Sequence, residues 1–210
     1  MQPPPRDLIV LVADKNTDYG LRGLLSRPKA LGIRPIEAQI LVHPRRDPGC
    51  RREAHDFLRP FIHDYRHALV MFDREGSGRD ASRQALEDEV SARVRESGWN
   101  VRADVIVLDP ELEVWVFTPS PHVEHCLKWP GNRGRVRPWL ERHGHWQHDH
   151  PKPRAPRDAL ERVLREIRRP RSSTLYQCLG ARVSLRQCVD GAFQKLLATL
   201  RVWFPPEELA

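Results

Sequence analysis

Four short aliphatic runs constrain the fold of this 210-residue chain more than any other feature of its sequence. Each run is apolar at consecutive positions, which is typical of a strand buried on both faces of a sheet. Segments with helical spacing or turn chemistry separate the runs. The sequence therefore predicts strands at Asp7–Ala13, Glu37–Val42, Ala68–Phe72 and Val105–Leu108.

The segments between these runs predict helices that connect parallel strands by right-handed crossovers. A loop over Asp14–Gly20 precedes a helix that runs to about Ala30. Apolar residues recur at helical spacing from Glu53 to Tyr65, where Pro60 predicts a kink. Asp80 can cap a further helix. We therefore expect an α/β fold with a mostly parallel four-stranded sheet and helices on both faces.

The amino-acid composition of the sequence changes after Trp115. Residues 1–117 are expected to form the α/β core, and residues 118–210 a basic segment with proline, histidine and tryptophan, followed by helices that pack on the core. No regular structure is predicted from Trp129 to Pro156. Two helices are predicted beyond it, with apolar faces at Leu160, Val163, Leu164 and Ile167, and at Phe193, Leu196, Leu197, Leu200 and Trp203.

The formal charge of +7 is concentrated in the C-terminal third of the chain. Between Leu127 and Arg171 there are 13 basic and 5 acidic residues, whereas the rest of the chain has 22 and 23. This asymmetry favours a polyanionic partner, because phosphates that are neutralised by Lys and Arg release their counterions. An ordinary arginine-rich surface is the alternative explanation.

The cysteines Cys50, Cys126, Cys178 and Cys188 form no Cys-x-x-Cys pair. In a chain of this length they indicate reduced, mostly buried thiols rather than a disulfide framework or a zinc site. The longest apolar runs fall far short of the roughly 20 residues of a membrane helix, and the N-terminus has no signal-peptide core. The cytoplasm is therefore the expected compartment, and a membrane is not an expected partner.

Acidic residues follow three of the four predicted strands. Because the carboxyl ends of parallel strands share one edge of the sheet, these side chains are expected to meet in a ligand crevice. Clustered carboxylates repel one another unless a cation neutralises them, and oxygen ligands without Cys or His select Mg²⁺, Mn²⁺ or Ca²⁺ rather than zinc. Helix capping is the alternative for any single acid. The acids are Asp14 and Asp18 after the first strand, Asp73 and Glu75 after the third, and Asp109, Glu111 and Glu113 after the fourth.

The order of these elements and acids resembles the Toprim fold of topoisomerases, primases and OLD-family nucleases. The turn Asp14-Lys-Asn-Thr-Asp18 is similar to the acid-Gly-x-Thr-Asp turn of OLD-like proteins, and Asp73-Arg-Glu75 resembles the Asp-x-Asp motif. Pro110-Glu-Leu-Glu-Val-Trp115 is similar to the Pro-x-x-Glu-x-Trp segment of small bacterial Toprim proteins, which are often encoded beside anti-phage and restriction systems. The resemblance covers about Asp7 to Trp115.

The resemblance implies phosphodiester cleavage with Mg²⁺ or Mn²⁺ as cofactor. Asp14 and Asp73 would be the catalytic residues, with Asp14 acting in proton transfer. Asp73 and Glu75 would hold the metal, and Asp14, Asp18 or Glu113 would complete the site or bridge to a second ion. The implied protein is a nuclease or nicking component of a bacterial anti-phage defence system, with DNA or RNA as substrate and other defence proteins, such as an ATPase, as partners.

The motifs also depart from the Toprim pattern. The first acid of the family is usually glutamate followed by glycine, whereas this chain has Asp14 and Lys15, and the second acid of Asp-x-Asp is Glu75. Such changes displace the oxygens, and catalysis tolerates little displacement. The alternative is therefore a catalytically inactive Toprim-like subunit that binds nucleic acid or a partner ATPase. A response-regulator-like domain is a weaker interpretation, because no lysine stands convincingly after a later strand.

The run from His143 to His150 contains four histidines in eight residues. A polar loop is favoured over a zinc site, because no second ligand cluster stands at the spacing of a structural site. Trp139 and Trp146 lie among arginines and could stack on unpaired bases, although buried anchors are favoured.

Overall fold

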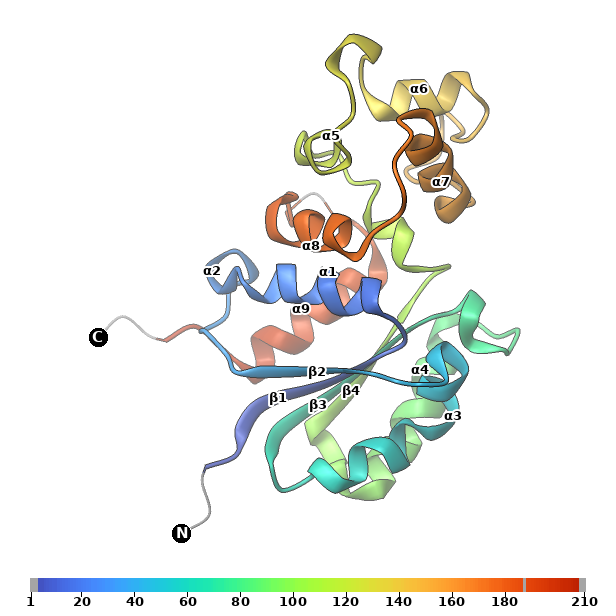
Figure 1. Cartoon of the computed structure of the whole chain (residues 1–210). Helices are drawn as coiled ribbons and strands as arrows, with labels where there is room; N and C mark the ends of the chain where they lie inside the picture. Colours follow the sequence, from blue (N-terminus) through green and yellow to red (C-terminus); the bar gives the residue numbers. More distant parts are fainter. Residues whose placement is uncertain (1–3, 187, 208–210) are drawn as a thin grey trace.

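The computed structural model describes residues 4–186 and 188–207 and centres on one parallel sheet. The strand order is β2-β1-β3-β4 (Figure 1). The strands are β1 (Arg6–Val12), β2 (Ala38–Val42), β3 (Tyr65–Asp73) and β4 (Ala103–Leu108), and every pairing between them is parallel. The predicted α/β class and the four-stranded parallel sheet are confirmed.

A helix follows each strand, and the last helix ends at Trp203. The helices are α1 (Lys15–Leu25), α2 (Pro28–Leu31), α3 (Arg46–Leu58), α4 (Arg83–Val94), α5 (His122–Leu127), α6 (Val136–Arg142), α7 (Pro156–Glu166), α8 (Ser173–Arg182) and α9 (Gly191–Trp203). Short 3-10 turns η2 (Glu75–Ser77) and η5 (Leu112–Trp115) follow β3 and β4. Among residues 4–186 and 188–207, no helix is long and apolar enough to cross a membrane.

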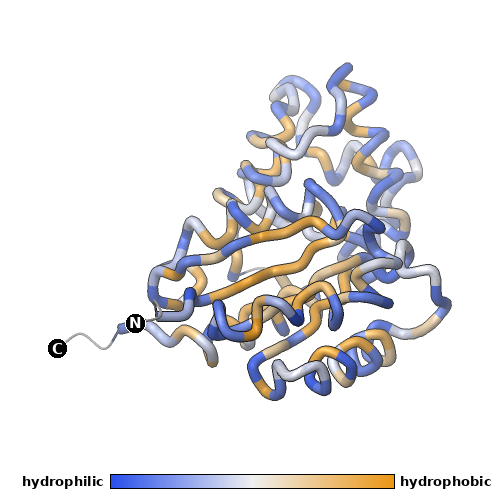
Figure 2. Tube along the Cα trace, turned by 60° about the horizontal axis from the view of Figure 1, so that its bottom comes forward, coloured by the Kyte–Doolittle hydropathy of each residue, from blue (hydrophilic) through white to orange (hydrophobic). Residues whose placement is uncertain are grey.

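Both faces of the sheet are covered, because alternate side chains of each strand point into different apolar layers. Leu8, Val10 and Val12 share one layer with α1, α8 and α9. Ile9 and Leu11 share the other with α3 and α4. All five side chains are fully buried, and Figure 2 shows the strands as apolar segments in the middle of the molecule. Burial on both faces explains why the strands are apolar at consecutive positions.

The outer edge of β4 is covered by side chains instead of another strand. Lys195 of α9 donates from Nζ to the Val105 carbonyl at 2.7 Å and to Glu87 Oε2 at 3.0 Å. Glu87 of α4 has a side chain that is only 1% exposed, and it accepts the Val107 backbone N–H at 3.1 Å. These contacts occupy backbone groups that would otherwise pair with a strand from another molecule.

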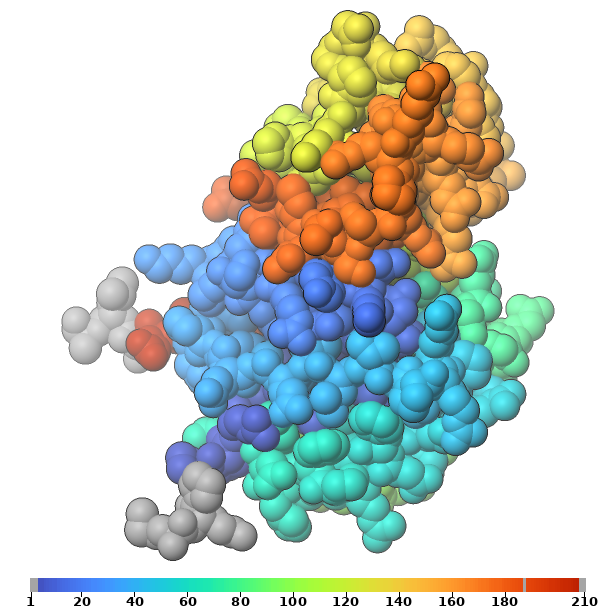
Figure 3. All heavy atoms as spheres, viewed as in Figure 1, coloured from blue at the N-terminus to red at the C-terminus, as the bar shows by residue number. Residues whose placement is uncertain are grey.

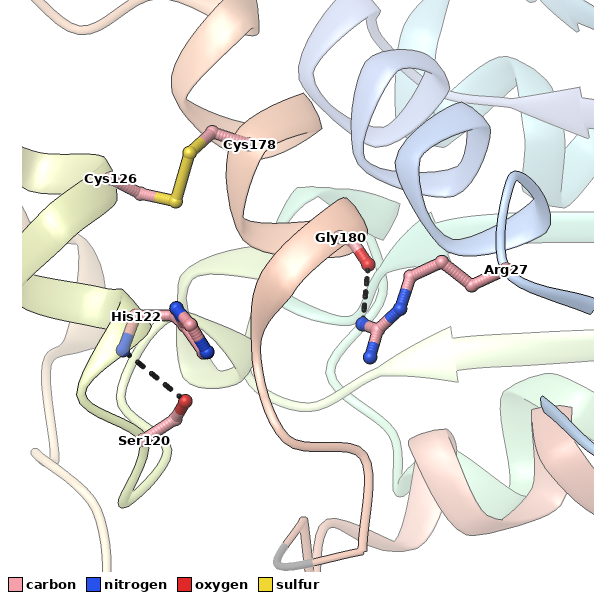
Figure 4. Close-up of a disulfide and its surroundings, with 6 residues drawn as sticks. All are labelled: Arg27, Ser120, His122, Cys126, Cys178 and Gly180. Atoms are coloured by element: carbon pink, nitrogen blue, oxygen red, sulfur yellow. Dashed lines mark hydrogen bonds between the residues drawn. A yellow bond between two sulfur atoms is a disulfide. The ribbon is translucent and has the colours of Figure 1, made fainter. Parts of the chain in front are cut away.

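Helix α8 crosses α1 at very short range because glycines lie at the contact. A Cβ atom on Gly23 would lie 2.4 Å from the Gln177 carbonyl oxygen, and one on Gly180 would lie 2.2 Å from the Gly20 carbonyl oxygen. Arg27 adds a hydrogen bond from Nη1 to the Gly180 carbonyl at 3.0 Å (Figure 4). A larger residue at either of these glycines would therefore push α8 away from the core.

Residues 118–172 form a layer that we call the cap, which contains α5, α6 and α7. Figure 3 shows the cap, coloured yellow-green to orange, stacked beyond α8 at the top of the molecule. Trp129, Trp139 and Trp146 are buried inside it. Lys152 fastens the cap to the chain that leaves the core, because its Nζ donates to the Val114 carbonyl at 2.9 Å. The chain then returns to the core through α8 and α9, which cover the sheet.

Several predicted boundaries differ from the structure. The predicted loop Asp14–Gly20 is wrong: α1 begins at Lys15, because Asp14 caps the helix by accepting the Thr17 backbone N–H at 2.8 Å. The helix expected from Glu53 to Tyr65 begins earlier, at Arg46, and ends at Leu58 before the proline. Helix α6 forms in the range that was predicted to be irregular, and α5 and α8 were not predicted.

The expectation of reduced thiols is wrong for two of the cysteines. Cys126 of α5 and Cys178 of α8 form a disulfide that joins the cap to the core (Figure 4). Cys50 and Cys188 are free and buried, as expected. The bonded residues are 52 positions apart, so only the folded arrangement of α5 against α8 reveals the pair.

Reduction of this disulfide is expected to lower the free energy of unfolding by about 2–4 kcal/mol, because the cross-link restricts the unfolded chain. Urea unfolding with and without dithiothreitol measures the difference. The double variant Cys126→Ser, Cys178→Ser is the control and should not respond to the reductant. Identical unfolding curves for the oxidised and reduced wild-type protein would contradict a cross-link at this position.

Candidate metal centre

The ends of β3 and β4 bring together acidic residues that are distant in the sequence. Asp73 is the last residue of β3, and its Oδ1 accepts the backbone N–H of Leu112 at 3.0 Å. After β4 the chain turns through a cis peptide bond between Asp109 and Pro110. The hydrogen bond between Leu112 and Asp73 holds the start of η5 over the end of β3.

Asp73, Glu111 and Glu113 form what we call the acid cluster. One carboxylate oxygen from each residue lies within 4.8 Å of the others. All three residues are buried, with 8%, 3% and 2% of their surface exposed. Three carboxylates this close together and this well buried could hold a metal ion.

Groups from the cap and from α8 contact the acid cluster. Arg157, at the start of α7, places Nη2 2.7 Å from Glu111 Oε2. Arg171 donates from Nη1 to Glu113 Oε1 at 2.9 Å, and the Tyr176 hydroxyl donates to the same oxygen at 2.5 Å. Burial and the charge of Glu113 raise the pKa of Tyr176, so the phenol stays protonated and remains a donor. The C-terminal part of the chain therefore completes the surroundings of the cluster.

The ionised form of the acid cluster is unfavourable in spite of these partners. Burial raises the pKa of the Asp73 carboxyl well above its ordinary value, and the charges of Asp47, Glu113, Asp14 and Glu111 raise it further. Burial and the charge of Glu113 also raise the pKa of Glu111. A raised carboxyl pKa means that the surroundings disfavour the ionised form, and a bound cation would reverse that preference.

One fully buried oxygen of the cluster has no hydrogen-bond partner among the described residues. The side-chain oxygen Oε2 of Glu113 is buried and accepts no hydrogen bond from the part of the chain that the structure describes. A buried carboxylate oxygen without a partner is costly and calls for an explanation. Since carboxylate oxygens are the preferred ligands of hard divalent cations, the residues present fit a metal ion.

The structure brings together two of the five predicted metal ligands, Asp73 and Glu113. Asp14 is half-buried at the start of α1, where its charge still raises the pKa of Asp73. Asp18 pairs with the Arg22 guanidinium at 2.6 Å. Glu75 is exposed on η2. The acid cluster is therefore built from the third and fourth strands, with Asp14 beside it.

Asp47 and Glu111 also belong to this region. Glu111 was expected in the crevice but not among the metal ligands, and Asp47 was not expected there. Asp47 lies in the first turn of α3 and accepts the Asp73 backbone N–H at 2.8 Å. Gly76 allows this approach, because a Cβ atom there would lie 2.5 Å from Asp47 Oδ2. The position of Asp47 after the second strand could have indicated its place at this edge of the sheet. No sequence pattern indicated that Arg157 would contact Glu111.

Residues of the His143–His150 run and the nearby tryptophans stabilise the cap by packing within it. His143 stacks on Trp139, with ring centroids 4.2 Å apart, and its Nδ1 lies 2.7 Å from the Trp139 carbonyl oxygen. Trp146 packs edge-on against Phe117. Both tryptophans are buried, so they are anchors of the cap and do not offer a face to unpaired bases. No histidine joins a potential metal-binding group within residues 4–186 and 188–207.

The raised carboxyl pKa values predict how the stability of the metal-free protein depends on pH. Asp73 and Glu111 return to ordinary pKa values of 3.8 and 4.5 in the unfolded chain. Between those values and the raised folded ones, the native state binds more protons than the unfolded state. Stabilisation by these protons is complete below the ordinary values and is lost as pH rises through the folded values.

Thermal unfolding in EDTA from about pH 4 to about pH 8 checks this expectation. The Tm of the Asp73→Asn variant, relative to that of the wild type, should increase with pH, because the variant lacks the carboxyl with the raised pKa. A constant difference across this range would contradict the assignment.

Comparisons with known proteins give no relative for this chain. No protein-family model matches it, no curated protein matches its sequence, and no solved structure matches its fold.

Proposed function

We propose that the protein is a Mg²⁺- or Mn²⁺-dependent enzyme that cleaves phosphodiester bonds of nucleic acid. The observation that carries the proposal is the acid cluster, with three buried carboxylates and one oxygen that lacks a partner. Its position supports the proposal, because ligands of open parallel sheets bind at the carboxyl ends of the strands.

In this proposal Asp73, Glu111 and Glu113 hold the cation. A cation held there would supply Lewis-acid chemistry, which activates water and stabilises charge on a phosphate. Asp14 accepts both of its hydrogen bonds from Thr17 through Oδ1, and we assign proton transfer from the water to its other oxygen, Oδ2. A neighbouring carboxylate is a suitable proton acceptor for such a step.

The basic cap supports nucleic acid as the substrate. The sequence segment Leu127–Arg171 has the excess of positive charge, and most of its arginines are exposed. Arg154, Arg162 and Arg165 line a surface hollow of about 620 Å³ beside α7. The same helix carries Arg157 to the acid cluster. A phosphate backbone bound along these arginines would lie on the helix that also carries Arg157.

A cleavage assay tests the proposal. Labelled single-stranded DNA, double-stranded DNA and RNA are incubated with the protein in Mg²⁺, in Mn²⁺ and in EDTA. We expect cleavage of at least one substrate with a divalent cation, none in EDTA, and none by Glu113→Gln. Absence of cleavage in every condition, or equal cleavage by Glu113→Gln, would overturn the proposed activity.

A second candidate is a non-catalytic subunit that binds nucleic acid or a partner ATPase. The observation that favours it is that Arg157 and Arg171 neutralise much of the charge of the cluster without a metal, while Tyr176 adds a hydrogen bond. Calorimetric titration with Mn²⁺ separates the candidates. Binding of nucleic acid without any uptake of Mn²⁺ would favour the second one.

The wider setting is proposed from the sequence motifs alone. The resemblance to Toprim proteins supports a place in a bacterial anti-phage defence system, with other defence proteins as partners. Co-purification of the tagged protein with an ATPase from its native host would support this setting, and recovery of the protein alone would count against it.

A further inference from the structure

Arg157 contacts every member of the acid cluster. Its Nη2 lies 2.7 Å from Glu111 Oε2 and 3.7 Å from Asp73 Oδ2. Its Nε lies 4.0 Å from Glu113 Oε2, the oxygen without a hydrogen-bond partner. A separation of 4.0 Å is too long for a hydrogen bond. The guanidinium therefore neutralises the cluster without satisfying all of its oxygens.

The backbone and the side chain of Arg157 are held differently. The backbone N–H donates to Glu111 Oε1 at 2.9 Å, which fixes the first turn of α7. The side chain is 46% exposed, whereas those of Glu111 and Glu113 are 4% and 3% exposed. The guanidinium can therefore leave by rotation of its own side chain, while α7 and the carboxylates stay in place.

The charge of the cluster favours an exchange of this guanidinium for a divalent cation. Three carboxylates face the two guanidiniums of Arg157 and Arg171, so one negative charge is in excess. A divalent ion in place of Arg157 would remove the excess. Arg157 faces all three carboxylates, whereas Arg171 contacts only Glu113, so an ion among the three would repel Arg157 most directly.

We propose that Arg157 has two successive positions: on the acid cluster while no cation is bound, and on a phosphate of the substrate after a divalent cation has displaced it. This inference rests on the proposed metal site. A guanidinium binds a phosphate with two parallel hydrogen bonds, so the displaced side chain is suited to that second position. Substrate would then be held firmly only when the metal is present.

The first test measures whether Arg157 and the cation compete. Mn²⁺ affinity is determined by calorimetry for the wild type, for Arg157→Gln and for Arg165→Gln, an exposed arginine on the same helix. We expect Arg157→Gln to bind Mn²⁺ about tenfold more tightly than the wild type, which corresponds to about 1.4 kcal/mol. Arg165→Gln should bind as the wild type does. Equal or weaker binding by Arg157→Gln overturns the competition.

The second test uses only the wild-type protein, so its result does not depend on whether a variant folds. Phenylglyoxal modifies accessible arginines, and mass spectrometry of the wild-type protein gives the rate at each position. We expect Mn²⁺ to accelerate modification of Arg157 and to leave that of Arg165 unchanged. Slower or unchanged modification of Arg157 with Mn²⁺ overturns the displacement.

The third test concerns the phosphate. Binding of a short single-stranded DNA is measured in Ca²⁺, which replaces Mg²⁺ to slow cleavage, and in EDTA. We expect Arg157→Gln to lose about tenfold in affinity in Ca²⁺ and little in EDTA, because a charged hydrogen bond to phosphate forms only after displacement. An equal loss in both conditions overturns the second position of Arg157.

These results separate the inference from the proposed function. If the wild type binds Mn²⁺ and Arg157→Gln binds it no more tightly, the metal site stands and the displacement fails. If the wild type and both variants take up no Mn²⁺, both the metal site and the displacement fail.

Discussion

Replacing Asp73 with asparagine is expected to abolish the proposed metal-dependent cleavage and, at the same time, to stabilise the metal-free protein. The variant loses a charged ligand, and we expect metal affinity and cleavage to fall at least about a hundredfold. The amide oxygen of the new side chain can still accept the Leu112 backbone N–H, which the Asp73 carboxylate accepts at 3.0 Å.

Stability should rise because the substitution removes a buried charge that Asp47, Glu113 and Glu111 repel. We expect a gain of about 1 kcal/mol in the free energy of unfolding in EDTA. Urea unfolding and the cleavage assay, carried out on the same preparation, measure both effects. A functional site that is less stable than its inactive variant is the usual result of selection for activity.

Glu75→Gln is the matched control, because Glu75 is only two positions away and is exposed. The structure predicts that this variant cleaves and unfolds as the wild type does. The Toprim-like motif makes the opposite prediction, since it assigns Glu75 as a metal ligand. Loss of cleavage in Glu75→Gln would therefore favour the motif over the acid cluster as the description of the site.

Replacing Lys195 with methionine is expected to lower the free energy of unfolding by about 3 kcal/mol, because it leaves a buried carboxylate without its counter-charge. Lys195 Nζ lies 3.0 Å from Glu87 Oε2 and 3.2 Å from Asp104 Oδ1, and the Glu87 side chain is 1% exposed. The Val105 carbonyl also loses a donor at 2.7 Å. For a chain of this size the Tm should fall by about 6–12 °C.

A double-mutant cycle identifies the cause of this loss. Glu87→Gln removes the charge and can still accept the Val107 backbone N–H, which now donates to Glu87 Oε1 at 3.1 Å. Combined with Lys195→Met, it should therefore restore part of the lost stability. A loss below about 1 kcal/mol for Lys195→Met alone would mean that the pair behaves as an exposed ion pair.

The strands could be predicted from the sequence because burial on both faces requires apolar residues at consecutive positions. Leu8 to Val12 are buried on both faces of the sheet, and the chain is apolar at each of these positions. Helices α7 and α9 could be predicted for a related reason, since each has one apolar face toward the core. Local burial and local sequence pattern agree in all of these elements.

The elements that escaped prediction depend on contacts between distant residues. The start of α1 looked like a loop, because Asp14, Asn16 and Thr17 are typical of turns as well as of helix caps. Helix α8 buries only a short apolar face, with Leu175, Tyr176 and Leu179, and its position depends on close packing against the glycines of α1. The disulfide between Cys126 and Cys178 depends on how α5 meets α8.

The sequence predicted the type of site and its place in the fold, but only some of the residues that form it. Acids at the ends of parallel strands indicated the edge of the sheet, and Asp73 and Glu113 do lie in the cluster. The sequence could not show which acids turn inward, because that depends on how η5 packs against the end of β3. Arg157 and Arg171 could not be inferred either, because the cap brings them back from far along the chain.

The place of the cap in the chain has a consequence for biosynthesis. The cap lies between β4 and α8, so a nascent chain completes it before the helices that close one side of the sheet. Until Trp203 has left the ribosome, Leu8, Val10 and Val12 lack part of their covering. A chain that stops after the cap would therefore expose a wide apolar surface and aggregate, instead of surviving as a weakened protein.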